Sequence, residues 1–223
     1  MSPGRRLPVA ALALLAALAL AGCGGSKSSS QSTSTDASGC TAVSPPSPKD
    51  RQTTKPTARL DASKTYDVRL QTNCGSFTIR LAVTTSPETT ASFVSLARKG
   101  YFDGTVFHRI VPGFVIQGGD PSGSGSGGPG YTTVDPPPAS TRYTLGVAAM
   151  AKTGSEPAGS SGSQFFVVTA KDAQLPPDYA VLGTVVEGLG VVKAIGRLGD
   201  PASGGEGVPT ETVEIEKATV DVH

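Results

Sequence analysis

Residues 107–120, FHRIVPGFVIQGGD, are the stretch of the chain that is most informative about its fold. Two short apolar runs, 106–110 and 114–117, lie on either side of Pro112 and Gly113. Short apolar runs bounded by Gly and Pro are typical of β-strands connected by turns. The stretch therefore predicts two short strands that follow each other closely in the chain.

The same pattern continues along the chain in both directions. Residues 66–71 and 77–81 alternate between apolar and polar side chains, and this period of two marks half-buried strands. Asn73-Cys74-Gly75 between them predicts a hairpin turn. Further strands are expected at the apolar runs 145–151, 164–169, 180–186 and 213–216.

Only two helices are expected. The first is marked by Ser86 as N-cap, Pro87 at the first helical position and a stop at residues 98–100. The second is expected over residues 187–195. Many short strands and few helices predict a mainly β fold over residues 64–223, in the form of a closed barrel with helical caps.

Composition and charge set limits on the function. The chain has 223 residues, of which 28 are Gly and 18 are Pro, so we expect one turn-rich domain with appendages. The formal net charge of +1 offers no electrostatic argument for nucleic-acid binding. Gly123, Gly125 and Gly128 fit a dinucleotide-binding spacing, but no helix is expected after them, so a nucleotide site is not expected.

The N-terminus has the layout of an export signal. Arg5 and Arg6 precede an apolar stretch, 7–21, which is shorter than the ~20 residues that a membrane-spanning helix needs. The step Leu20-Ala21-Gly22-Cys23 resembles the lipobox of bacterial lipoproteins. It implies removal of residues 1–22 and acylation of Cys23, which places the protein on the outer face of the cell membrane. An ordinary signal peptide with a chance cysteine is the alternative.

A low-complexity segment follows. Residues 23–63 are rich in Ser, Thr, Gly and Pro, and their composition predicts a flexible tether. Cys40 and Cys74 remain once Cys23 is lipidated, and in an oxidising compartment they either pair with each other or stay as two free thiols. No CxxC spacing is present, so neither a redox motif nor a zinc site is expected.

Four motifs together carry a resemblance to one family. Residues 107–120 resemble the signature of the cyclophilin-type peptidyl-prolyl isomerases almost position for position. The glycine-rich loop 121–131, Ala149-Met150-Ala151 and Gly162-Ser163-Gln164-Phe165-Phe166 follow in that family's order. The resemblance covers roughly residues 64–220. It implies a closed eight-stranded antiparallel β-barrel capped by two helices, with prolyl isomerase activity.

The chemistry of this reaction can be stated from first principles. Rotation about an Xaa-Pro bond has a barrier of about 20 kcal/mol, because amide resonance is lost on the way. The catalyst needs an apolar slot for the proline ring and a fixed donor for the prolyl nitrogen, which regains its lone pair when the amide twists. It needs no nucleophile, metal or cofactor, and none is expected here.

The resemblance also assigns the residues of the site. Arg109 would be the charged donor, and Gln117 would bind the substrate backbone and orient Arg109. Phe114, Val115, Phe166 and Leu175 would line the proline pocket. The main chain of Ala151 and Lys152 would pair with the substrate, and the groove would also contain His108, Gln164 and Tyr179. Ordinary core packing for the apolar residues, and a solvated charge for Arg109, are the alternatives.

Three departures from the family pattern bear on specificity. The segment 152–161 is about three residues longer than in well-known members. Gln174 stands at the position of a Trp that contacts the inhibitor cyclosporin in the family, so weaker inhibition is expected. Tyr179 stands where many members have His.

The function expected from the sequence is therefore prolyl isomerisation in proteins that fold after export. The partners would be Pro-containing polypeptides and, through the lipid alone, a membrane; nucleic acid is not expected, and the protein would be a monomer. The alternative is a module on the same fold that binds Pro-containing peptides as a chaperone or scaffold without catalysis.

Overall fold

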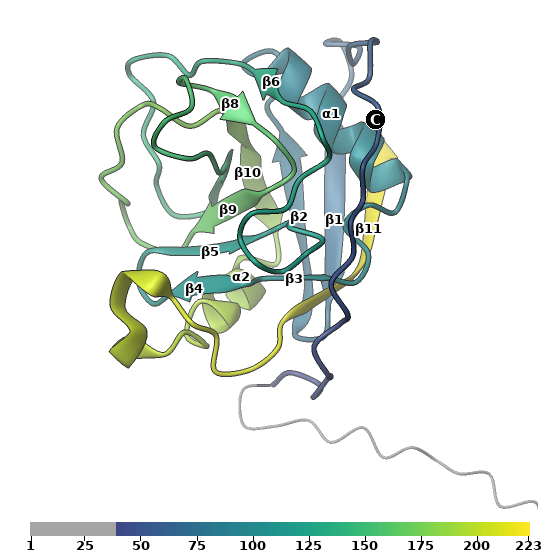
Figure 1. Cartoon of the computed structure of the whole chain (residues 1–223). Coiled ribbons are helices and arrows are strands. Elements are labelled where there is room, and N and C mark those ends of the chain that lie inside the picture. Colours follow the sequence, from purple (N-terminus) through teal and green to yellow (C-terminus); the bar gives the residue numbers. More distant parts are fainter. Residues whose placement is uncertain (1–38) are drawn as a thin grey trace, which may run out of the picture. The chain divides into compact units, whose positions relative to one another are not determined.

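The computed structural model describes residues 39–223, and its main element is an antiparallel sheet of nine strands (Figure 1). Across the sheet the strands lie in the order β3 (Thr105–Val106), β11 (Glu214–Val222), β1 (Tyr66–Thr72), β2 (Gly75–Leu81), β10 (Val181–Glu187), β7 (Val147–Met150), β9 (Phe165–Val168), β5 (Val115–Gly118) and β4 (Arg109–Val111). Two short strands, β6 (Thr133–Val134) and β8 (Ser160–Ser161), form a separate pair.

The sheet is curled but open, so the expectation of a closed eight-stranded barrel is wrong. Only Phe107 and His108 separate β3 from β4, yet these strands form the two opposite edges of the sheet. Within residues 39–223, the isolated bridge between Val106 and Asp120 is the one pairing that links β3 to the chain leaving β5. Strand β3 has two residues, both paired with β11, which is too little backbone to carry a continuous ladder round to the other edge.

Helix α1 (Pro87–Arg98) lies where the sequence predicts it and packs on the inside of the curled sheet. Phe93 on its buried face meets Phe165 of β9 edge to face, with ring centroids 5.4 Å apart. The expected cap is only partly correct, because Ser86 precedes the helix but its hydroxyl makes no capping hydrogen bond. Asp135 supplies the missing acceptor, since its Oδ2 accepts from the Thr89 amide at 2.7 Å.

The second expected helix is α2 (Leu189–Ile195), and a short 3-10 segment, η1 (Pro201–Glu206), follows it. The sequence pattern contained no signal for η1. This segment contacts β4, and it therefore borders the candidate site.

Strands β5, β7 and β9 carry apolar side chains on both faces. In β9, Phe165 and Val167 join the main core, while Phe166 and Val168 belong to a second, smaller apolar cluster on the opposite face. Successive side chains of a strand point to opposite faces, so a run of four apolar residues builds both cores. The second cluster is the one that supports the candidate site.

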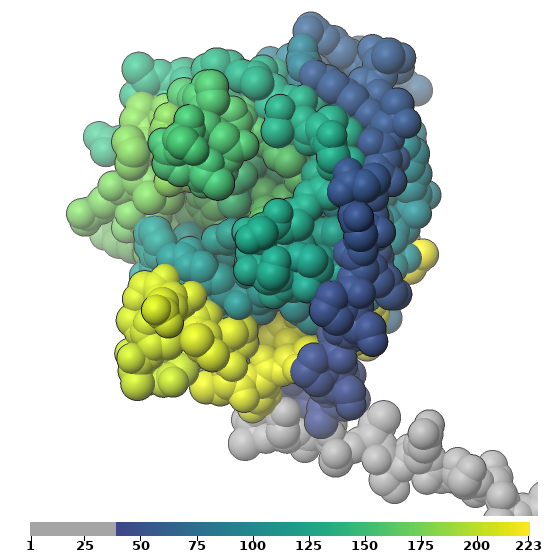
Figure 2. All heavy atoms as spheres, viewed as in Figure 1, coloured from purple at the N-terminus to yellow at the C-terminus, as the bar shows by residue number. Residues whose placement is uncertain are grey.

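The segment 40–60, which we call the N-terminal strap, differs from the expected flexible tether. It runs along the surface of the domain (dark blue in Figures 1 and 2) and belongs to the same compact unit as the sheet. A disulfide joins Cys40 to Cys74 in the β1–β2 turn, and Leu60 packs against the main core. Composition misses this arrangement, because the strap is held by hydrogen bonds to other segments and by the disulfide, with few apolar contacts of its own.

The expected signal peptide (1–22), the lipidated Cys23 and the tether as far as residue 38 lie outside the described residues. In the part of the chain that the structure describes, no helix combines the length and apolar character needed to cross a membrane.

Candidate active site

The β4–β5 hairpin brings the two central polar residues of the site face to face. In its register Arg109 lies directly opposite Gln117, and Ile110 lies opposite Ile116. The hairpin can close because Gly113 adopts a φ of 69°, a conformation that favours glycine. Arg109 Nη1 donates a hydrogen bond of 3.3 Å to Gln117 Oε1, so the pair that the sequence predicted forms within one hairpin.

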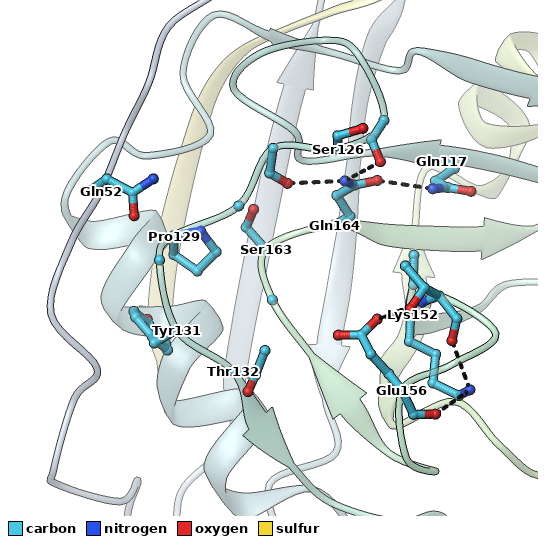
Figure 3. A pocket seen from close by; sticks show the side chains of 17 residues that line it. Gln52, Gln117, Ser126, Pro129, Tyr131, Thr132, Lys152, Glu156, Ser163 and Gln164 are labelled. Carbon is cyan, nitrogen blue, oxygen red and sulfur yellow. Dashed lines mark hydrogen bonds between the residues drawn. The ribbon is translucent and has the colours of Figure 1, made fainter.

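A chain of side-chain amides continues from this pair. Gln117 Nε2 donates to Gln164 Oε1 at 3.1 Å, across strands β5 and β9. Gln164 Nε2 in turn donates to the carbonyl oxygens of Gly125 and Gly127 at 2.9 and 3.0 Å (Figure 3). These contacts place Gln164 as the link between Arg109 and the glycine loop, which we define as residues 121–131.

The guanidinium of Arg109 is held from a second side by the η1 segment. Its Nε and Nη2 donate to the carbonyl oxygen of Gly205 at 3.1 and 2.9 Å. The Phe114 ring centroid lies 6.0 Å from Arg109 Cζ. Burial lowers the pKa of Arg109, and Tyr179 partly opposes this, but an arginine keeps its charge at neutral pH. The site therefore contains a fixed cation with a defined orientation.

An apolar surface lies next to this cation. Phe166 and Val115 belong to the second apolar cluster. The other predicted pocket residues, Phe114, Leu175 and Tyr179, pack against it. The Phe166 and Tyr179 rings meet edge to face at a centroid distance of 5.4 Å. The structure thus gathers the residues that were expected to line a proline pocket, although they come from four separate segments of the chain.

Tyr143 belongs to this cluster and was missed in the sequence. Its side chain is buried, its ring lies 5.9 Å from that of Tyr179, and its hydroxyl donates to Tyr179 O at 2.6 Å and accepts from Tyr179 N at 3.0 Å. Burial raises the pKa of Tyr143, so the hydroxyl stays protonated and can donate. A single tyrosine in a polar stretch offers no local signal for this role.

Lys152 contributes through its side chain, which is only 4% exposed. Its Nζ forms an ion pair with Asp178 Oδ2 at 2.7 Å and lies 5.7 Å from the Tyr179 ring centroid. The same atom donates to the carbonyl oxygens of Thr153 and Glu156 at 3.2 and 3.0 Å, which braces the longer 152–161 segment. A buried, fully bonded ammonium of this kind holds the wall of the site.

The main chain of Ala151 is bonded to the segment that carries Gln164. Its main-chain N–H donates to the carbonyl oxygen of Gln164 at 2.9 Å. That N–H is already bonded, so the pairing of Ala151 with a substrate through its carbonyl oxygen stays a prediction.

His108 also lies away from the rest of the expected groove. It lines a separate hollow of about 500 Å³ that is bordered by Pro45 and Pro46 of the strap. Burial lowers the pKa of His108, with Asp120 opposing and Arg109 adding to the decrease, so the imidazole is neutral at pH 7. Its Nε2 lies next to the glycine loop, 3.8 Å from where a Cβ atom of Gly125 would be.

A pocket of about 760 Å³ opens beside Gln117 and continues along the glycine loop (Figure 3). Gln164 and Ser163 form its floor, and Lys152 and Glu156 form one rim. Gln52 of the strap lies at the opposite rim, which no feature of the sequence indicated.

Comparisons with known proteins agree with this geometry. Residues 67–220 match the family model described as "Cyclophilin type peptidyl-prolyl cis-trans isomerase/CLD". The chain is similar to peptidyl-prolyl cis-trans isomerase-like 1 of Gibberella zeae, with 39% identity over 163 residues that cover 70% of this chain and 95% of the relative. It is also similar to peptidyl-prolyl cis-trans isomerase ppi1 of Schizosaccharomyces pombe, with 38% identity over 68% of this chain and 97% of the relative.

Solved structures give the same result. A cyclophilin-type peptidyl-prolyl cis-trans isomerase of Cryptosporidium parvum matches with a TM-score of 0.63 and 28% identity, over 70% of this chain and 98% of that one. A second structure of that protein, determined in the presence of the dipeptide Ala-Pro, matches with a TM-score of 0.62. The chain belongs to the cyclophilin-type peptidyl-prolyl cis-trans isomerase family, whose members bind Pro-containing peptides.

Proposed function

We propose that this chain isomerises Xaa-Pro bonds by stabilising the twisted amide with Arg109. One observation carries the proposal: a charged guanidinium is held in a fixed orientation beside an apolar cluster whose outer residues, Phe114, Leu175 and Tyr179, are half-buried. Arginine has five N–H groups, and the bonds to Gly205 and Gln117 use three of them. Two N–H groups remain to donate to a substrate.

The apolar cluster supplies the other requirement. A proline ring seated against Phe166 and Val115 would bury apolar surface in the planar and twisted states alike, so this contact binds substrate without selecting the transition state. The charge on Arg109 interacts more strongly with the pyramidal nitrogen of the twisted state, because the planar amide has no free lone pair there. Binding and rate acceleration are therefore assigned to different residues.

Gln117 joins the two functions. Its Oε1 accepts from Arg109, while its Nε2 donates to Gln164, so both ends of the side chain are fixed. This arrangement orients the guanidinium and leaves a second lone pair on Oε1 for a substrate amide. A structure of the Cryptosporidium parvum relative was determined in the presence of the dipeptide Ala-Pro, which supports an Xaa-Pro unit as the part of the substrate that the site recognises.

For the cellular role, we propose that the enzyme acts on exported proteins from the outer face of a cell membrane. The export signal and lipobox ending at Cys23 support this location, and the Cys40–Cys74 disulfide is typical of an oxidising compartment. Uncatalysed prolyl isomerisation takes tens of seconds or longer, so newly exported chains would benefit from a catalyst. The anchor is the proposed contact with the membrane, and the enzyme would act as a monomer.

Two experiments test these parts separately. The activity is tested by cis/trans isomerisation of an Ala-Pro peptide by the wild-type chain and by Arg109→Ala. The location is tested by fractionation and lipid labelling of the wild-type protein and of Cys23→Ala. Unchanged lipid labelling of Cys23→Ala would exclude the proposed anchor without affecting the assignment of the reaction.

A further inference from the structure

The N-terminal strap contacts the glycine loop at both of its ends. The amide of Lys49 donates to the carbonyl oxygen of Pro121 at 2.9 Å, and the amide of Thr53 donates to that of Pro129 at 3.0 Å. Figure 2 shows the strap passing beside this loop on the surface. The strap lies before residue 67, where the match to the family begins, so these contacts are an addition to the part shared with the family.

Side chains anchor the strap between these two hydrogen bonds. The guanidinium of Arg51 donates to the carbonyl oxygens of Gly100 and Asp103 at 3.2 and 2.7 Å, and also to that of Tyr101. Lys99 Nζ donates to Thr53 Oγ1 at 3.0 Å. Three carbonyl acceptors around one guanidinium form an anchor on the chain just after α1.

Gln52 fits against the glycine loop directly. A Cβ atom at Gly130 would overlap Gln52 Oε1, the tip of an exposed and flexible side chain, so the Gln52 side chain lies in direct contact with the loop. Gly130 also has a φ of 84°, which favours glycine independently of this contact. The strap therefore touches the loop through a side chain as well as through its backbone.

The glycine loop needs such support. Five of its eleven residues are glycines, and each glycine loses more backbone freedom on ordering than any other residue. Inside the loop, the buried carboxylate of Asp120 accepts from the amides of Ser122, Gly125 and Gly127. The strap adds donors for the carbonyl oxygens of Pro121 and Pro129, which the Asp120 carboxylate, itself an acceptor, cannot bind.

The loop is connected to the catalytic arginine. The carbonyl oxygens of Gly125 and Gly127 fix Gln164, Gln164 fixes Gln117, and Gln117 accepts from Arg109. Every link is a hydrogen bond of 3.3 Å or less. A displacement of the loop would therefore change the restraints on the guanidinium.

We propose that residues 49–53 of the strap are positioning residues for the isomerase site: they fix the glycine loop and, through Gln164 and Gln117, the orientation of Arg109. This rests on the proposed role of Arg109. A misplacement of about 1 Å at a catalytic group can cost about 100-fold in rate. Since Arg109 acts on the twisted state, loosening the strap lowers kcat more than it raises KM.

The test compares two arginines of the same segment in the whole chain. Arg51→Ala removes the anchor, Arg51→Lys keeps one charged donor, and Arg59→Ala is the matched control, because Arg59 is exposed and pairs with Glu88 at 3.5 Å. The readouts are kcat and KM for an Ala-Pro peptide, together with amide hydrogen exchange of Gly125 and Gly127. Thermal unfolding shows whether each variant is folded.

We expect kcat to fall roughly tenfold in Arg51→Ala, with faster exchange in the loop, partial recovery in Arg51→Lys and no change in Arg59→Ala. If Arg51→Ala does not fold, Thr53→Pro serves instead, since it removes the amide that donates to Pro129 O. Wild-type kcat in the folded variant, or a change in KM alone, overturns the positioning role. Arg109→Ala is run beside it: full activity there would refute the proposed function itself, whatever the strap variants show.

Discussion

Replacing Arg109 by alanine is the most direct test of the site. The substitution removes the charge and the two N–H groups that the bonds to Gly205 and Gln117 leave free. It leaves the apolar cluster around Phe166 in place, so peptide binding should persist. The expected effect is therefore concentrated in kcat.

The size of the effect follows from the surroundings of the guanidinium. Loss of one preorganised donor costs about 100- to 1,000-fold in rate, equivalent to about 2.7–4 kcal/mol. Arg109 is only half-buried, so solvent screens part of its charge, and we expect the lower end of that range. The carbonyl of Gly205 is exposed and can bind water instead, so the cost in folding stability should be small, about 1 kcal/mol.

The assay is cis/trans isomerisation of an Ala-Pro peptide, with kcat and KM determined separately and folding checked by circular dichroism. Arg109→Lys should recover only part of the rate, because an ammonium group cannot reproduce the planar fork. Arg197→Ala is the matched control, since Arg197 is exposed and donates to Lys193 O outside the site. A folded Arg109→Ala that isomerises the peptide at the wild-type rate would refute the catalytic assignment and favour a non-catalytic peptide-binding module.

Three further results are expected. Phe166→Ala should raise KM as well as lower kcat, because the ring is expected to contact the proline in both the planar and the twisted state of the amide. A folded variant with unchanged KM would show that Phe166 is not part of the proline pocket. The pH profile of kcat/KM should be flat between about pH 7.5 and 9, because the pKa of His108 is lowered from its ordinary value of about 6.5 and Arg109 stays charged throughout. A bell-shaped profile in that range would indicate acid–base catalysis instead. Cys40→Ser should lower the free energy of unfolding, measured by urea titration, by about 3–4 kcal/mol, as expected for a crosslink with a sequence separation of 34 residues. An unchanged urea midpoint would show that the disulfide is not needed to hold the strap.

Much of the fold could be predicted because its determinants are local, and the site residues could be predicted from the resemblance of a few short motifs to the family. Residues 107–120 contain both strands of one hairpin and the turn between them, so Arg109 and Gln117 meet through neighbouring backbone alone. Helix α1 has its proline, apolar face and basic end within one short segment. The apolar run that includes Phe166 is a strand with both faces covered, as four consecutive apolar residues indicate.

Other features depend on which distant segments come together, and no local pattern encodes this. The carbonyl of Gly205 reaches Arg109 from a segment 96 residues away, and Tyr143 bonds the backbone of Tyr179 from 36 residues away. Asp135 replaces Ser86 as the helix cap from 46 residues beyond Thr89, because a buried donor is satisfied by whichever acceptor the fold brings near.

Local sequence patterns also could not predict whether the sheet closes or where the strap lies. The sequence by itself determined the positions of most strands and of α1, since each follows from periodicity or capping signals within about a dozen residues, whereas the pair Arg109 and Gln117 was expected from the resemblance to the family. Only the tertiary structure decided that the sheet stays open, that the Lys152 side chain is buried in an ion pair with Asp178, and that residues 40–60 lie against the domain. These features depend on hydrogen bonds, an ion pair and a disulfide between segments far apart in the chain. Such contacts stabilise the protein only after folding has brought the segments together.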